Sequence, residues 1–119
     1  MCKIINLTQH SSTEDQKAVG VCDFECPEVK ELLTFETLPT TQEVRERARQ
    51  LAKLAANQGY HAAMIAGAPW LMPPLVEELK LRGVIPLFAF SVRKSEEEHQ
   101  ADGSVRKTVV FKHEGFIES

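Results

Sequence analysis

Apolar residues along this chain fall into two spacing patterns that alternate from one end to the other. Short, nearly continuous apolar runs are typical of strands buried on both faces of a sheet. They occur at Lys3 to Leu7, Val21 to Phe24, Ala62 to Ala66 and Val84 to Val92. Between these runs, apolar residues recur every three or four positions, which indicates helices with one buried face. The expected helices run from Thr13 to Gly20, Pro27 to Leu33, Thr41 to Gln58 and Leu71 or Met72 to Gly83.

The helix ends carry local signals that support this division. Thr13 with Gln16, and Thr40 with Glu43, have the spacing of a capping box, in which two side chains satisfy free backbone N–H groups at a helix start. Glycines follow three of the helices at positions 20, 59 and 83, as is common after a helix C-terminus. Strands that alternate with helices in this way predict parallel β-α-β units joined by right-handed crossovers.

The C-terminal third departs from that alternation. A charged excursion from Arg93 to Gln100 is expected to leave the last parallel strand and to reach a turn at Asp102-Gly103. Thr108 to Phe111 and Phe116-Ile117 then predict an antiparallel edge strand. The length fits one domain, residues 1–119. The predicted fold is therefore an α/β, Rossmann-like, three-layer domain with a mostly parallel sheet of about four strands and a C-terminal antiparallel strand.

Composition argues against several classes of protein. The formal net charge of -3 argues against a duplex nucleic-acid binder, because such proteins usually carry a basic excess. No apolar run approaches the ~18 residues of a membrane span, and the N-terminus does not resemble a signal peptide. Cys2, Cys22 and Cys26 lack zinc or redox spacing, and we expect them to be free thiols in a reducing compartment. We therefore expect a cytoplasmic protein without a membrane partner, a metal site or a cofactor.

Ligands of open parallel sheets bind beyond the carboxyl ends of the strands, and the first such segment here is rich in polar groups. Asn6, Thr8, Gln9 and His10 offer amide, hydroxyl and imidazole groups that can contact a base or a ribose. The helix start at Thr13 can offer backbone N–H groups to an anion. The alternative is that Asn6 and Thr8 satisfy local turns and that His10 is a solvated loop residue.

The second segment, Gly67-Ala68-Pro69-Trp70, follows the third predicted strand. Gly67 permits close approach of a ligand to the backbone, and the next helix start favours a phosphate. Trp70 can stack on a base, but packing in the core or in a dimer interface is an equally good interpretation. The segment is neither a G-x-G-x-x-G nor a Walker loop, so no standard dinucleotide or triphosphate site is indicated.

The remaining candidates lie near the last two predicted strands. Ser91, Arg93 and Lys112 provide a hydroxyl and two cations that can balance phosphates. Strand alternation puts His113 on one face with Phe111, so a satisfied, partly buried histidine is the default interpretation. Exposed in a cleft, His113 could instead transfer protons near neutral pH. The sequence shows no metal-ligand cluster, nucleophile elbow or pair of catalytic carboxylates.

Both ends of the chain resemble small CRISPR-associated ring nucleases. The N-terminal part carries Asn6-Leu7-Thr8-Gln9-His10, followed by Thr13 and Gln16. The C-terminal part carries Arg93, Asp102-Gly103-Ser104, Lys107, Val110-Phe111-Lys112-His113 and Phe116. The middle of the chain, including Gly67 to Trp70, fits only at the level of the fold.

The resemblance implies a Rossmann-like protein of antiviral defence that binds a cyclic oligoadenylate, with cyclic tetra-adenylate as the expected ring, at the two-fold interface of a homodimer. It implies metal-independent cleavage, in which a ribose 2′-hydroxyl attacks the neighbouring phosphorus and leaves a 2′,3′-cyclic phosphate. Lys112 and Arg93 would stabilise charge, and His10 or His113 would act as general acid or base. A non-catalytic sponge or sensor and an unrelated nucleotide- or metabolite-binding protein remain alternatives, whereas the polar strand exits disfavour a purely structural subunit.

Overall fold

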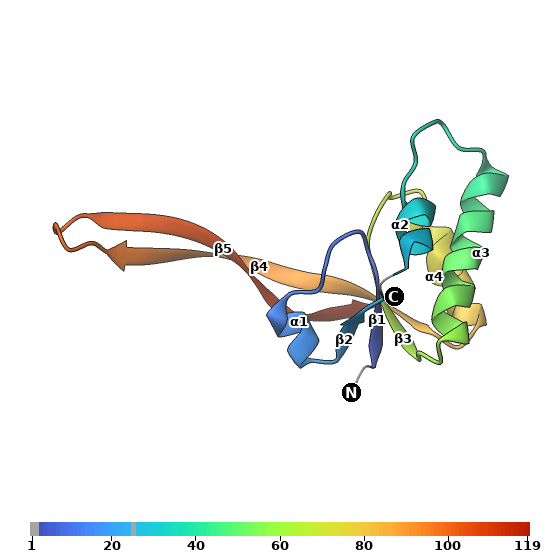
Figure 1. The fold of residues 1–119 in the computed structure, drawn as a ribbon, viewed down its shortest axis with the longest axis horizontal. Coiled ribbons are helices and arrows are strands. Elements are labelled where there is room, and N and C mark those ends of the chain that lie inside the picture. The colour runs from blue at the N-terminus through green and yellow to red at the C-terminus, as the bar shows by residue number, and fades with distance from the viewer. Residues whose placement is uncertain (1–2, 25) are drawn as a thin grey trace.

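A computed structural model of the chain describes residues 3–24 and 26–119, with side chains at all of these positions except 93, 94, 96, 98 and 108–111. Its centre is one five-stranded sheet in the order β2-β1-β3-β4-β5 (Figure 1). The strands are β1 (Ile4–Leu7), β2 (Val21–Asp23), β3 (Ala62–Ile65), β4 (Ile85–His99) and β5 (Val105–Glu118). The first four strands are parallel and β5 is antiparallel to β4. The α/β class, the mostly parallel sheet and the antiparallel last strand are thereby confirmed.

Four helices connect these strands and cover the sheet unequally. They are α1 (Glu14–Ala18), α2 (Pro27–Leu33), α3 (Thr41–Asn57) and α4 (Met72–Leu81). Figure 1 shows α1 on one side of the sheet and the other three helices together on the opposite side. The larger core cluster joins α2, α3 and α4 to the strand side chains of Ile5, Leu7, Ala63 and Ile65. The smaller cluster, on the other face, consists of Ile4, Val21 and Met64.

The helix boundaries follow the local signals of the sequence. Thr13 and Gln16 form both hydrogen bonds of a capping box, which satisfies two N–H groups at the start of α1. Thr40 accepts from the backbone N–H of Glu43, but the Glu43 carboxylate pairs instead with Arg47 at 3.0 Å. The second capping box is therefore only half formed. The five apolar positions of α3 are all buried, as their spacing predicted: Val44, Ala48, Leu51, Ala52 and Ala55.

The C-terminal hairpin differs from the prediction. The segment expected to be a charged excursion continues β4 as regular strand to His99, and β5 pairs with it back to Glu118. The turn at Asp102-Gly103 and the antiparallel strand predicted over Thr108 to Phe111 and Phe116-Ile117 lie where they were expected. The register shifts between Phe90 and Ser91, and a shift of this kind bends a two-stranded ribbon. Beyond it, the ribbon leaves the body of the protein as a long projection (Figure 1).

We call residues 91–113 of this ribbon the arm. The arm makes the molecule strongly elongated, with principal extents of 59 × 36 × 25 Å. The radius of gyration is 17.3 Å, whereas a compact domain of this length has about 13.5 Å. A strand that is paired along only one edge can carry charged side chains, because they remain in contact with water. None of the arm side chains that the structure describes belongs to the hydrophobic core, so apolar periodicity could not reveal the arm.

The cysteines also depart from expectation. Cys22 is disulfide-bonded, so the prediction of three free thiols is wrong for this residue, while Cys26 is a free thiol. The expected reducing compartment therefore loses the support of Cys22. Within residues 3–24 and 26–119, none of the helices has the length and apolar character needed to cross a membrane.

Candidate functional site

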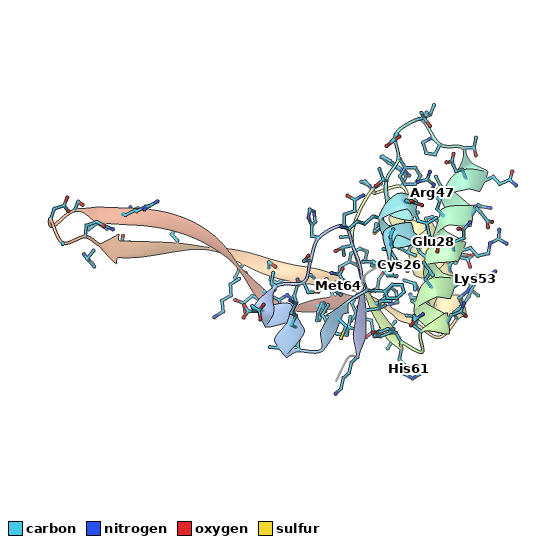
Figure 2. The ribbon with its side chains drawn as sticks, in the orientation of Figure 1. Cys26, Glu28, Arg47, Lys53, His61 and Met64 are labelled. Atoms are coloured by element: carbon cyan, nitrogen blue, oxygen red, sulfur yellow. The ribbon has the colours of Figure 1, made fainter. Side chains whose placement is uncertain are left out.

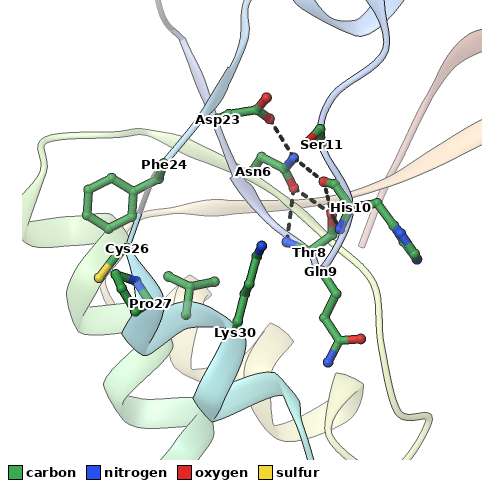
Figure 3. Close-up of a pocket in the computed structure, with 11 residues that line it drawn as sticks. Asn6, Thr8, Gln9, His10, Ser11, Asp23, Phe24, Cys26, Pro27 and Lys30 are labelled. Atoms are coloured by element: carbon green, nitrogen blue, oxygen red, sulfur yellow. Dashed lines mark hydrogen bonds between the residues drawn. The ribbon is translucent and has the colours of Figure 1, made fainter.

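A cleft of about 570 Å³ opens at the carboxyl ends of β1 and β2. One wall is the loop that follows β1, and the other is the start of α2 (Figure 3). Its lining is polar near the loop and apolar near the helix. The lining residues are Asn6, Thr8, Gln9, His10, Ser11, Asp23, Phe24, Cys26, Pro27, Val29 and Lys30. The cleft therefore gathers Asn6, Thr8, Gln9 and His10, four of the residues selected from the sequence.

The Asn6 side chain organises the loop wall of the cleft. Asn6 is 5% exposed, and its Nδ2 lies 2.8 Å from the carbonyl oxygen of His10, 2.9 Å from Asp23 Oδ1 and 3.1 Å from Ser12 Oγ. Its Oδ1 accepts from the backbone N–H and the hydroxyl of Thr8, at 3.0 and 2.7 Å. The amide thus satisfies local turns, as the alternative interpretation stated. The Asn6 side chain holds the loop after β1 in place, and Figure 3 shows its hydrogen bonds to Thr8, His10 and Asp23.

Asp23 is the negative group of the cleft, and sheet register explains its place. Asn6 and Asp23 are direct partners in the β1–β2 ladder, so both side chains point to the same face of the sheet. Asp23 Oδ1 accepts from the Ser12 hydroxyl at 2.6 Å and from the Ser12 backbone N–H at 2.9 Å. These donors, with the amide of Asn6, hold the pKa of Asp23 below its ordinary value. The carboxylate is therefore ionised at neutral pH and fixed in orientation.

Lys30 is the positive group of the cleft, and the sequence interpretation missed it. It lies on the first turns of α2 and is exposed, and Figure 3 shows its side chain extending from the helix toward the loop that carries Thr8. Asp23 was missed as well. The rule that ligands bind at strand carboxyl ends was applied to three strands and not to β2. Applied there, it selects Asp23 and the helix that begins at Pro27.

Gln9 and His10 stand on the outer side of the loop. Gln9 Nε2 donates to the hydroxyl of Thr34 at 2.9 Å, which ties the loop after β1 to the end of α2. The imidazole of His10 is exposed and points away from Lys30 (Figure 3). Among the described residues, no hydrogen-bond partner orients its ring nitrogens. His10 can therefore reach a ligand only at the mouth of the cleft.

The segment Gly67-Ala68-Pro69-Trp70 lies at the carboxyl end of β3 and does not line this cleft. Trp70 is 53% exposed, so it is not a core residue. Its ring meets Phe35 edge-on, with centroids 5.8 Å apart. Arg47 covers the other ring, at 4.3 Å from its centroid, and Figure 2 shows Arg47 reaching from α3 toward α2. Trp70, at the neighbouring strand exit, therefore forms an aromatic pair with the partly buried Phe35 that follows α2.

The candidates at the C-terminal end lie on the arm. Ser91 pairs with His113 across the ribbon, and Lys112 pairs with Val92. The Lys112 side chain is exposed, whereas the Arg93 side chain lies outside the described part of the structure. Of the candidates on the arm whose side chains the structure describes, Ser91, Lys112 and His113, none is in the lining of the cleft.

His113 occupies an unusual environment at the root of the arm. Its ring packs on Phe116 with centroids 4.8 Å apart, which fits the expected partly buried histidine. Both ring nitrogens are buried, and neither has a hydrogen-bond partner in the described part of the chain. The expectation that this histidine is satisfied is therefore wrong there. Within residues 3–24 and 26–119, no group of three or more His, Cys, Asp or Glu side chains is arranged to hold a metal ion.

Comparison with protein-family models assigns the chain to a family. Residues 2–117 match the model of the uncharacterized protein MJ1673 family, and the chain belongs to this family. Neither the curated proteins nor the solved structures include a match. The chemistry of the cleft therefore has to be argued from its own residues.

Proposed function

We propose that the cleft binds a cyclic oligoadenylate second messenger of type III CRISPR defence and that the protein is a metal-independent ring nuclease. One observation carries the proposal. The residues of the N-terminal segment that resembles ring nucleases, Asn6 to His10, form one wall of a cleft whose other wall presents Lys30. An anion and a base can therefore be held between a cation and a row of amide and hydroxyl groups.

The topology supports a nucleotide ligand. The parallel part of the sheet has the order β2-β1-β3-β4, which is the order of flavodoxin-like, doubly wound sheets. We propose that the domain is Rossmann-like in this sense. In such sheets, ligands bind beyond the carboxyl ends of the strands near the point where the strand order reverses. Here that point lies between β1 and β3, so the loop after β1 and the Gly67–Trp70 segment stand on its two sides.

The charges of the cleft suggest how a nucleotide would lie in it. Lys30 is the group that can pair with a phosphate, because charge-assisted contacts to phosphate are among the strong hydrogen bonds of proteins. Asp23 would repel the phosphate, but its fixed carboxylate can accept from a ribose hydroxyl or from the exocyclic amino group of adenine. Phe24 and Pro27, at the apolar end of the lining, can contact the face of a base.

The proposed reaction is an internal transfer in which the nucleophile is the ribose 2′-hydroxyl and not a water molecule, and it needs no metal. The ribose 2′-oxygen forms a bond to phosphorus while the bond from phosphorus to the 5′-oxygen breaks, which leaves a 2′,3′-cyclic phosphate and a 5′-hydroxyl. The 2′-hydroxyl gives its proton to a neutral imidazole at the mouth of the cleft, His10, and the leaving 5′-oxygen takes one from solvent or from an ammonium group. Lys30 stabilises the negative charge that builds up on the phosphorane oxygens.

Binding is the first test, and Lys30 is the residue to change. Lys30→Ala removes the cation that the cleft presents, and loss of one charge-assisted contact costs about 1.5–3 kcal/mol. The dissociation constant for cyclic tetra-adenylate, measured by calorimetry, is therefore expected to rise by about 10- to 150-fold. Lys53→Ala is the matched control, because Lys53 is an exposed lysine on α3 that points away from the cleft (Figure 2).

The Lys112→Ala variant distinguishes ligand binding in the cleft from ligand binding on the arm. If the cleft holds the phosphate, Lys112→Ala changes the affinity much less than Lys30→Ala does. A result in which Lys112→Ala abolishes binding and Lys30→Ala has no effect would reject the cleft. No binding of cyclic tetra-adenylate or cyclic hexa-adenylate at 100 µM by the wild-type protein would reject the proposal as a whole.

A non-catalytic binder of the same ligand is the second candidate, and the His10 environment favours it. A general base is usually oriented by a third group, whereas in the described part of the chain nothing orients the His10 ring. Product analysis in EDTA separates the two. Conversion of the ring to linear products with 2′,3′-cyclic phosphate ends, lost in His10→Ala, supports the nuclease. Tight binding with no product at a molar excess of protein supports the binder.

A further inference from the structure

The polar groups on the loop wall of the cleft are largely bonded to one another. The Asn6 amide and the Thr8 hydroxyl bond to each other and to neighbouring backbone atoms of the loop, and the Ser12 hydroxyl donates to Asp23. Groups engaged in this way hold the loop but keep little capacity to select a ligand. Asp23 differs, because it is exposed and, in the described part of the chain, its hydrogen bonds all go to one of its two carboxylate oxygens.

Three donors converge on Asp23 Oδ1. They are the Ser12 hydroxyl at 2.6 Å, the Ser12 backbone N–H at 2.9 Å and the Asn6 amide at 2.9 Å. Because these bonds hold Oδ1, the carboxylate cannot exchange its two oxygens without breaking all three. Each carboxylate oxygen accepts through its own lone pairs, so Oδ2 keeps its full capacity as an acceptor. Oδ2 is therefore a negatively charged acceptor, restricted in position, on a residue that lines the cleft.

An oligonucleotide offers such an acceptor two kinds of donor, the ribose hydroxyls and the N–H groups of a base. The 2′-hydroxyl lies beside the 3′-phosphate, where a carboxylate is repelled by the phosphate charge. The exocyclic amino group of adenine lies at the edge of the base remote from the ribose, so a contact there keeps the two negative charges apart. Phe24, the residue after Asp23, and Pro27 line the same cleft and can hold the face of the base. The amino group is therefore the better partner for Oδ2.

We infer that Asp23 determines the base specificity of the cleft, by accepting a hydrogen bond at Oδ2 from the exocyclic amino group of adenine. The inference rests on the proposed function and assigns, within it, the residue that distinguishes adenine from a base with an oxo group at the same place. Hypoxanthine gives the sharpest contrast, because its 6-oxo group is an acceptor where adenine has a donor. A site that bonds a polar group of its ligand rejects an analogue without that group far more strongly than an apolar pocket does.

Asp23→Asn tests the inference because it inverts the polarity of one atom. The three donors to Oδ1 keep the amide oxygen of the variant side chain in that place, so its amide nitrogen takes the position of Oδ2 and becomes a donor. Dissociation constants are measured by calorimetry for cyclic tetra-adenylate and cyclic tetra-inosinate. We expect the wild-type protein to bind the adenine ring about tenfold or more tightly than the inosine ring. We expect Asp23→Asn to reverse this order and to prefer the inosine ring.

Glu28→Gln is the matched control, because Glu28 is an exposed carboxylate in the first turn of α2 and does not line the cleft. It removes the same charge from the neighbourhood of a bound phosphate and is expected to leave the ratio of the two dissociation constants unchanged.

The outcomes separate this inference from the proposed function. Equal binding of the two rings by the wild-type protein overturns the inference and leaves the proposed function standing, and this result does not depend on how any variant folds. An Asp23→Asn variant that binds both rings more weakly in equal measure assigns Asp23 to the ribose or to the support of the loop, and overturns the inference too. Binding of neither ring by the wild-type protein at 100 µM overturns both.

Discussion

The buried amide of Asn6 allows a direct test of how the candidate cleft is held together. Replacing Asn6 by aspartate keeps the size and shape of the side chain but turns the donating amide group into a carboxylate oxygen. That oxygen would face Asp23 Oδ1 across the 2.9 Å now spanned by a hydrogen bond, and the carbonyl oxygen of His10 across 2.8 Å. Asn6→Asp thus replaces two attractive contacts by two repulsive ones at a site that is 5% exposed.

The size of the effect follows from these distances. Two unit charges at the separation of the hydrogen bond between Asn6 and Asp23, 2.9 Å, repel by about 1.4 kcal/mol in water and by about 6 kcal/mol at an effective dielectric constant of 20. Asp23 is exposed, and the two carboxylates can move apart, so the lower part of that range applies. The lost hydrogen bonds add about 1–2 kcal/mol. We expect the free energy of unfolding, from urea titrations at pH 7, to fall by about 3–4 kcal/mol.

The pH dependence separates charge repulsion from lost packing. The neighbouring Asp23 and burial both raise the pKa of the introduced carboxylate above its unfolded value. Its destabilising effect is therefore complete above the raised pKa and shrinks as the pH falls toward the unfolded pKa of about 3.9. Asn6→Ala is the matched control, with a loss of about 2 kcal/mol that does not depend on pH between 7 and 4.5. Equal losses for the two variants at pH 7, or a parallel pH dependence, would refute the reasoning.

Two further predictions concern the supports of the site. Asp23→Asn removes a carboxylate whose pKa is lowered by Ser12 and Asn6, so the stability that it contributes is present above pH 3.8 and is lost as the pH falls further. Because Asp23 is exposed, we expect the wild-type advantage in urea to be below ~1.5 kcal/mol at pH 7 and to shrink as the pH is lowered below 3.8; an advantage independent of pH would contradict this. Arg47→Lys loses the guanidinium contacts to the Phe35 ring at 4.3 Å and to the carbonyl oxygen of Leu32 at 3.4 Å. Hydrogen exchange in residues 34–40 should become about tenfold faster, with Arg45→Lys as the control, and unchanged exchange would argue against an anchoring role.

The fold of the body was predictable because burial leaves a periodic trace in the sequence. The positions of α3 that recur at helical spacing are those buried in the larger core cluster, including Ala48 and Leu51, which are both fully buried. The start of α4 was predictable for a different reason. Pro73 and Pro74 lack the N–H groups that an interior turn would need, so they fit only the first turn.

The cleft was only partly predictable, because its two charged groups belong to different elements. Asn6, Thr8 and His10 could be selected as a polar cluster on one loop. The contact of Asn6 with Asp23 depends on strand register, which pairs these two residues over a separation of 17 residues. From the sequence alone, Lys30 cannot be distinguished from any other exposed lysine on a helix. It enters the site because the chain turns directly from β2 into α2, so that this helix begins beside the strand ends.

The arm shows where apolar periodicity stops being informative. A strand in a core must alternate apolar and polar residues or be apolar throughout, because one or both faces lose water. Residues 93–98 are charged at every position except Ser95, so their sequence resembles a solvated loop even though their backbone is paired with β5. Two register pairs join opposite charges and fit a strand: Glu97 is paired with Lys107, and Glu98 with Arg106. Such cross-strand pairs stabilise a ribbon only modestly, and they can be recognised only once the register of the two strands is known.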